Sequence, residues 1–194
     1  MNQPSIPRTD PAPLPPPAAA GTRVENVDTP APLLDLDAFE HNLRKLNETL
    51  RGSNVRVRPH VKSHKCAQIA LRQIALGAVG VCCQKVSEAE ALVHGGVPDV
   101  LVSNEIVSPQ KIARLAAFAG RARIGVCVDD LGNVADLDRA TRGVGTRLDV
   151  YVEVDVGANR CGVAPGEPAL RLAQAIARAG ALRFAGELIQ LVGV

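Results

Sequence analysis

A strongly basic side-chain face is the first feature of this sequence that could carry chemistry. Along residues 55–65, apolar residues alternate with cationic ones, so an extended chain places Arg56, Arg58, His60 and Lys62 on one face. On a solvated sheet edge this face would simply be hydrated. In a (β/α)8 barrel it would point inward and bring Lys62 to the C-terminal mouth, where barrel enzymes hold their catalytic groups. A lysine that is partly desolvated there can form a Schiff base with a carbonyl.

Neighbours of Lys62 compete with it for this role. Lys65 falls one step into the helix that we expect after the strand, so its side chain is expected to face solvent. His64 is placed similarly, and a structural role with hydrogen-bonded ring nitrogens is expected for it. His60 shares the face of Lys62 and could stack beneath or beside a bound ring.

A second polar set lies between residues 151 and 163. In an extended strand the alternating valines face the helices, which leaves Tyr151, Glu153 and Asp155 pointing into the interior. Polar side chains on a buried face are costly unless they are paired. Two glycines then permit a tight loop that would project Arg160 over the strand ends. A salt bridge between Arg160 and Asp155 is the alternative that needs no ligand.

The cysteines match neither a disulfide framework nor a zinc site. They have no C-x-x-C spacing and no histidine at zinc-finger spacing, so free buried thiols are expected. The adjacent pair Cys82 and Cys83 lies in an apolar run, where the two side chains would point to opposite faces. No metal ligand is therefore predicted in this chain. The five residues are Cys66, Cys82, Cys83, Cys127 and Cys161.

Short apolar runs alternate with amphipathic segments from Asp28 onward, which is typical of repeated βα units. Between these runs, Ser87 and Glu90 have capping-box spacing, and Ser108 precedes a proline that would start a helix. The order leaves two architectures, a doubly wound open sheet or a (β/α)8 barrel. The predicted strands are Leu33–Asp37, Val55–Val61, Ala78–Gln84, Val100–Asn104, Ile124–Asp129, Val150–Val156 and Phe184–Val194.

Composition separates a tail from the rest of the chain and excludes some partners. Seven of the 14 prolines fall within the first 17 residues, so residues 1–27 are predicted to be a disordered tail. The net charge of +2, without a basic block interleaved with aromatics, argues against nucleic acid. Neither a stretch of about 18 apolar residues nor signal-peptide order is present. We therefore expect a cytoplasmic protein without a membrane partner.

Three segments resemble the D-threonine aldolase and D-3-hydroxyaspartate aldolase family, and more loosely the D-serine dehydratases and alanine racemases. They are residues 58–65, 79–91 and 152–163, in the family's order and spacing. The resemblance implies a pyridoxal 5'-phosphate enzyme of the alanine-racemase barrel type. It also implies that Lys62 bonds to the cofactor, that Gln84 contacts it, and that Arg160 lies near its phenolic oxygen. Glu153 stands where alanine racemases carry a lysine, which argues against racemisation.

The same resemblance implies that the barrel over residues 28–194 is incomplete. After Gly186 the family would continue toward a phosphate cradle, further strands, and a histidine and acidic residue that bind a divalent metal, Mg²⁺ or Mn²⁺. We expect these parts to be missing here. It further implies that Leu33–Asp37 belongs to a companion β-domain, that Val55–Lys62 is the first barrel strand, and that a full-length form is a homodimer.

The predicted function is that of a carbon–carbon lyase. It would cleave a D-β-hydroxy-α-amino acid, such as D-3-hydroxyaspartate or D-threonine, to glycine and an aldehyde, and this chain alone is expected to be inactive. A D-serine dehydratase-like lyase and a non-catalytic barrel that binds pyridoxal phosphate remain alternatives. A nicotinamide-binding domain is disfavoured, because Gly143 and Gly145 lack the third glycine of the G-x-G-x-x-G turn.

Overall fold

The structure, a computed structural model, describes residues 18–189 in two compact units, Met1–Asn42 and Leu43–Val194. The described part of the first unit contains a short 3-10 turn, η1 (Val24–Asn26), and the start of helix α1 (Leu36–Thr49). The Asp35 carboxylate accepts a hydrogen bond from the Ala38 N–H at 2.9 Å, which caps this helix. The strand predicted over Leu33–Asp37 is therefore wrong.

The predicted tail falls only partly within the described residues. Residues 1–17 lie outside them, so the prediction for that part has no structural counterpart. The boundary between a tail and a barrel at residue 28 stays a prediction.

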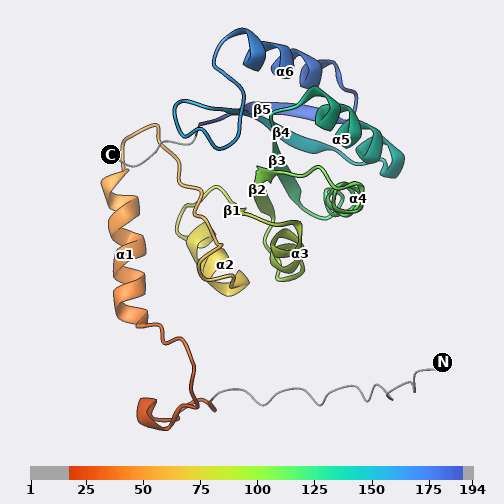
Figure 1. The fold of residues 1–194 in the computed structure, drawn as a ribbon. Helices are drawn as coiled ribbons and strands as arrows, with labels where there is room; N and C mark the ends of the chain where they lie inside the picture. The colour runs from red at the N-terminus through yellow and green to blue at the C-terminus, as the bar shows by residue number, and fades with distance from the viewer. Residues whose placement is uncertain (1–17, 190–194) are drawn as a thin grey trace, which may run out of the picture. The chain divides into compact units, whose positions relative to one another are not determined.

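The second unit is built on a five-stranded parallel sheet in the order β1-β2-β3-β4-β5 (Figure 1). Because each strand pairs with the next one along the chain, right-handed crossovers place all the connecting helices on the same face. A doubly wound sheet would reverse its strand order, so this is part of a (β/α)8-type barrel. The strands are β1 (Val81–Cys83), β2 (Asp99–Glu105), β3 (Arg123–Val128), β4 (Leu148–Val154) and β5 (Leu182–Ile189).

Helices α3 to α6 follow the strands, and α2 precedes β1 (Figure 1). Helix α4 begins at Pro109 after Ser108, as predicted. Helix α3 begins at Val86, so the predicted capping box at Ser87 is wrong, and the Glu88 carboxylate instead accepts a hydrogen bond from the Gln84 N–H at 2.9 Å. The helices are α2 (Ala67–Ala75), α3 (Val86–His94), α4 (Pro109–Phe118), α5 (Leu131–Val144) and α6 (Glu167–Arg178).

The core between sheet and helices is aliphatic. On β4, every second side chain from Leu148 to Val154 is buried against the helix layer, and the residues between them face the opposite side of the sheet. Burying each such side chain contributes about 1.5–3 kcal/mol. Within residues 18–189, none of the helices combines the length and the hydrophobicity needed to cross a bilayer.

The segment over residues 55–61 lies beside β1 without forming the regular strand that we predicted. The Val57 carbonyl accepts from the Val79 N–H at 2.9 Å, and the Pro59 carbonyl accepts from the Cys82 N–H at 2.7 Å. A single parallel bridge joins His60 to Cys82. Proline has no N–H to donate, which explains why the ladder stays irregular.

All five strands of the sheet differ from the predicted ranges by one to three residues at the ends that the structure describes. Strand β1 begins at Val81 and not at Ala78, because Gly80 has a φ of +144° that interrupts the extended run. Strand β5 is described as far as Ile189, and residues 190–194 of the predicted strand lie outside the described residues.

Candidate active site

A cavity of about 260 Å³ lies at the carboxyl ends of the strands, on the face that the helices do not cover. It contains all four residues to which the sequence assigned the cofactor, His60, Lys62, Gln84 and Arg160. They come from three separate segments of the chain, which the parallel sheet brings to one edge. The complete lining is Arg58, His60, Lys62, Cys82, Gln84, Ser103, Glu153, Arg160, Leu188 and Ile189.

The two lysines of the first motif have different surroundings. Lys62 lines the cavity from a turn that follows His60, and its side chain is exposed, where we expected partial desolvation. Lys65 precedes helix α2, and its Nζ lies 3.3 Å from Glu88 Oε1 in a different cavity. The geometry therefore favours Lys62 as the nucleophile. Bonding of Lys62 to a cofactor stays a prediction.

His60 is held in one tautomer by its neighbours. Its Nδ1 accepts a hydrogen bond from the Lys62 N–H at 3.2 Å, so the proton lies on Nε2, which is 3.2 Å from Ser103 Oγ. The Ser103 hydroxyl in turn donates to the Cys83 carbonyl at 3.2 Å. Burial, followed by the positive charge of Lys62, lowers the pKa of His60. Both effects favour the neutral form of the ring.

Gln84 and His64 differ in their relation to the cavity. The Gln84 amide donates to the Ser103 carbonyl at 3.5 Å, which keeps its side chain at the cavity wall. His64 is absent from the lining, and its Nδ1 accepts from the Cys66 N–H at 3.1 Å. Its Nε2 is buried without a hydrogen-bond partner among the described residues, so only one of the two ring nitrogens is bonded as we expected.

Arg160 is carried by the loop of residues 155–163, which folds back on its own strand. The Asp155 carboxylate accepts from the N–H groups of Gly157 and Asn159, at 2.9 and 3.0 Å, and these bonds lower its pKa. The Val163 N–H donates to the Glu153 carbonyl at 2.9 Å. Within the described chain no ion pair joins Arg160 to Asp155, so the salt-bridge alternative is wrong. Asp155 turns onto the loop and does not face the interior.

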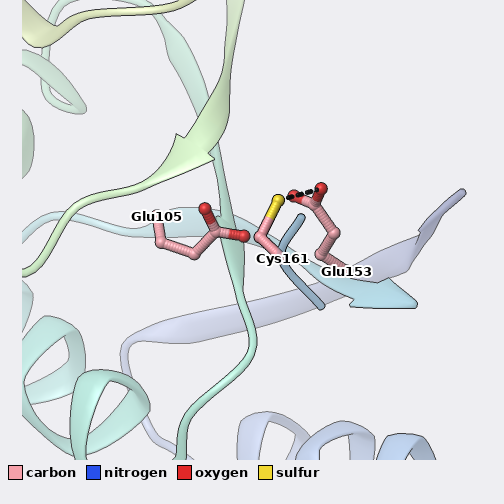
Figure 2. Close-up of side chains that lie close together, drawn as sticks. All are labelled: Glu105, Glu153 and Cys161. Atoms are coloured by element: carbon pink, nitrogen blue, oxygen red, sulfur yellow. Dashed lines mark hydrogen bonds between the residues drawn. The ribbon is translucent and has the colours of Figure 1, made fainter. Parts of the chain in front are cut away.

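A cluster of Glu105, Glu153 and Cys161 lies beside this loop (Figure 2). Their oxygen and sulfur atoms are within 4.8 Å of one another, and the Cys161 thiol donates to Glu153 Oε1 at 2.9 Å. Burial, and then hydrogen bonding to Glu153, raises the pKa of Glu105 to about 7. The inward direction of Glu153 was predicted, but Glu105 was missed because the predicted strand ended at Asn104. Extending the period-two pattern by one residue would have found it.

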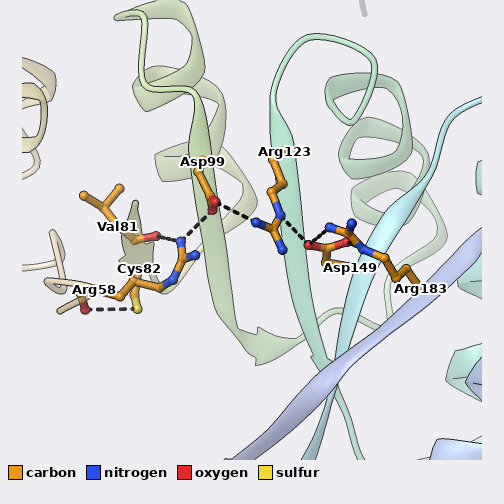
Figure 3. A network of polar contacts seen from close by, with 7 residues as sticks. All are labelled: Arg58, Val81, Cys82, Asp99, Arg123, Asp149 and Arg183. Atoms are coloured by element: carbon orange, nitrogen blue, oxygen red, sulfur yellow. Dashed lines mark hydrogen bonds and ion pairs between the residues drawn. The ribbon is translucent and has the colours of Figure 1, made fainter. Parts of the chain in front are cut away.

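The sheet face that carries the cavity also carries a row of alternating charges at the amino ends of the strands (Figure 3). This charge ladder consists of Arg58, Asp99, Arg123, Asp149 and Arg183. The closest ion pairs have nitrogen–oxygen distances of 2.6 Å, and Arg123 lies 3.5 Å from Asp99. Burial opposes ionisation of Asp149, but hydrogen bonds and charges from Arg183 and Arg123 outweigh it and lower its pKa. The ladder links the segment before β1 with β2, β3, β4 and β5.

Comparison with known proteins identifies similar chains. Residues 34–188 match the alanine racemase N-terminal domain. The D-threonine aldolase of Arthrobacter sp. is 49% identical over 173 residues, covering 89% of this chain and 46% of that protein. The 3-hydroxy-D-aspartate aldolase of Paracoccus denitrificans is 47% identical over 172 residues, covering 88% and 44%. The crystal structure of D-threonine aldolase from Filomicrobium marinum matches with a TM-score of 0.87 at 56% identity, covering 90% and 47%.

The predicted family and barrel type are thus confirmed, and the chain spans about half the length of these relatives. The chain belongs to the alanine racemase N-terminal domain family, within its D-threonine aldolase and 3-hydroxy-D-aspartate aldolase group.

Proposed function

We propose that this protein is a pyridoxal-phosphate-dependent aldolase that cleaves a D-β-hydroxy-α-amino acid to glycine and an aldehyde. D-Threonine and D-3-hydroxyaspartate are the proposed substrates. The observation that carries the proposal is the convergence of Lys62, His60, Gln84 and Arg160 on one cavity. The names of the aldolase relatives, about half identical to this chain where they align, support the substrate class.

The donor groups around the cavity fit pyridoxal phosphate chemically. Lys62 offers a primary amine that can bond to the aldehyde carbon of the cofactor. Arg160 offers a cation for the phenolic oxygen, Gln84 an amide, and His60 a flat ring. When bound, the cofactor supplies a ring that accepts the electron pair released at Cα as the Cα–Cβ bond breaks.

The residues of the chain have distinct proposed roles around the reacting carbon. The Lys62 amine would hold the cofactor, and as a free amine it could hold a proton near Cα of the substrate. Arg160 would favour the ionised form of the cofactor's phenolic oxygen through its positive charge. The lowered pKa of His60 favours its neutral form, which would place a ring beside the cofactor without adding positive charge next to Lys62 and Arg160. In the overall cleavage, the substrate β-hydroxyl loses a proton to become the aldehyde, and Cα gains a proton to become the methylene carbon of glycine.

A divalent metal, Mg²⁺ or Mn²⁺, belongs to the proposed activity. Its role would be that of a Lewis acid toward the substrate hydroxyl. We assign its ligands to none of the residues described above.

A chimera tests the activity directly, because the chain spans about half the length of its relatives. Residues 28–189 would replace the equivalent segment of the Filomicrobium marinum D-threonine aldolase. We expect release of glycine from D-threonine with pyridoxal phosphate and Mn²⁺ present, at least 100-fold faster than from L-threonine. The matched control is the same chimera with Lys62→Ala.

The outcomes separate the alternatives. Pyruvate from D-serine, with no glycine from either hydroxy acid, would place the protein with the dehydratases. A folded chimera that binds the cofactor but turns over none of these substrates would favour a cofactor-binding protein without activity.

A further inference from the structure

Glu105 and Glu153 bring two carboxyl groups together in a partly buried cluster. Glu105 ends β2, Glu153 lies near the end of β4, and Cys161 lies between their side chains (Figure 2). Glu153 lines the candidate cavity, whereas Glu105 lines a different one. Glu153 is only 3% exposed, and Glu105 Oε1 is buried without a hydrogen-bond partner among the described residues, which leaves Oε2 to face Glu153. Their carboxyl oxygens lie within 4.8 Å of each other and of Cys161 Sγ.

A third carboxyl group acts on this pair. Asp129, at the end of β3, adds a third carboxylate that raises the pKa of Glu105 further. The cations that line the cavity together with Glu153 are Lys62, Arg160 and Arg58, the last of which is paired with Asp99. Two carboxylates in a partly buried site avoid repulsion by sharing one proton, which turns the repulsion into a hydrogen bond. The pKa of Glu105, about 7, agrees with this arrangement.

The pair is connected to the loop that carries Arg160. The Cys161 thiol donates to Glu153 Oε1, and the next residue, Gly162, donates its N–H to Asp129 Oδ2 at 3.1 Å. The Val163 N–H donates to the Glu153 carbonyl. Three successive residues after Arg160 are thus bonded to strand ends that carry carboxylates. A shift of the Glu153 side chain would release the first of these bonds.

We propose that Glu105 is a positioning residue: by sharing one proton with Glu153, it holds Glu153 as the acceptor for Cys161 and so keeps Arg160 at the cavity. When the proton is lost, the two carboxylates repel each other and the loop of residues 155–163 loosens. The inference rests on the proposed function only in that Arg160 is expected to contact the cofactor.

The test uses the whole chain without cofactor, so its outcome is independent of the proposed activity. Hydrogen exchange of the Gly162 and Val163 amides is followed from pH 6 to pH 8.5 and corrected for intrinsic exchange. We expect their protection to fall about tenfold across this range in the unmodified chain. Carbon-13 NMR of labelled glutamate should show one carboxyl that titrates near neutral pH.

Substitutions at Glu105 distinguish a shared proton from a merely structural side chain. Glu105→Gln keeps a neutral donor toward Glu153, so the protection should stay high at all pH values and the neutral titration should vanish. Glu105→Ala should lower the protection at every pH. Glu167→Gln removes an exposed carboxylate on α6, with 69% of its side chain accessible, and should behave as the unmodified chain does.

Three results would overturn the proposal. Protection could be independent of pH in the unmodified chain, or it could fall equally in Glu105→Gln. Alternatively, both carboxyls could prove ionised at pH 6. If Glu105→Ala does not fold, comparing the pH dependence of protection in the unmodified chain and in Glu105→Gln still tests the proposal. Failure of Lys62 to bond to pyridoxal phosphate would contradict the proposed function and leave this result standing.

Discussion

At the scale of single residues, the choice between Lys62 and Lys65 depends on their neighbours. Lys65 is paired with Glu88, whereas Lys62 lines the cavity with Arg160. We expect borohydride reduction in the presence of pyridoxal phosphate, followed by peptide mapping, to place the label on Lys62. Lys62→Ala should lower labelling at least tenfold, and Lys65→Ala should leave it within twofold. A label on Lys65 alone would reverse the assignment.

Asp149 gives a second prediction at this scale, about stability. Its side chain is 7% exposed and bonded to Arg123 and Arg183, so Asp149→Asn should lower the free energy of unfolding at pH 7 by about 2 kcal/mol. The pKa of Asp149 is lowered by folding, so this stabilisation is present above its ordinary value of 3.8 and is lost as the pH falls through the folded value.

Urea denaturation of both proteins at pH 7 and at acidic pH measures this difference. The difference in the free energy of unfolding between the unmodified chain and Asp149→Asn should become smaller at acidic pH. Asp136→Asn, which alters an exposed pair on α5, should change the free energy of unfolding by less than about 0.5 kcal/mol. An equal loss in the two variants would show that the ladder contributes no more than surface charges do.

At the scale of elements, two glycines of the Arg160 loop make a matched pair. Both have positive φ, +119° at Gly157 and +96° at Gly162. A Cβ at Gly157 meets nothing within 4 Å, whereas one at Gly162 would lie 2.9 Å from the Asp155 backbone nitrogen. We expect Gly157→Ala to cost about 1 kcal/mol through φ strain alone, and Gly162→Ala at least twice that.

Urea denaturation of the two variants tests this difference, and amide exchange shows whether the loop has opened. Similar losses of stability in Gly157→Ala and Gly162→Ala would mean that the loop can move away from Glu153.

The elements also show what a sequence can predict in this fold. Strands β2 to β5 follow from valine-rich runs, because a buried parallel strand leaves a long apolar signal. Residues 33–37 were misread, since two leucines look the same before a strand or before a helix that Asp35 caps. His60 and Lys62 were found through their alternation along one segment, whereas Gln84 and the cofactor role of Arg160 came only from the family resemblance. The proximity of Glu105 to Glu153 could not be found this way, because it depends on the spacing of nonadjacent strands.

At the scale of the whole molecule, the open side of the sheet decides what this chain can do alone. Within the described residues β5 pairs only with β4, and the chain spans about half the length of its relatives. We expect the chain to bind pyridoxal phosphate at least tenfold more weakly than the chimera, with little turnover, and to self-associate through exposed strand edges. Absorbance titration, glycine release and light scattering measure these properties. Tight stoichiometric binding with metal-dependent cleavage by a monomer would contradict this expectation.

The charge ladder has a consequence for how this fold can change over time. It ties neighbouring strands together at their amino ends, while the cavity lies at their carboxyl ends. Substitutions at the two ends share few partners, so their effects on stability should add. Substitutions of cavity residues during evolution can therefore alter what the cavity binds without changing the register of the strands. Arg58 belongs to both the charge ladder and the cavity lining, so a substitution there affects strand register and the cavity together. We therefore expect few substitutions to be tolerated at this position.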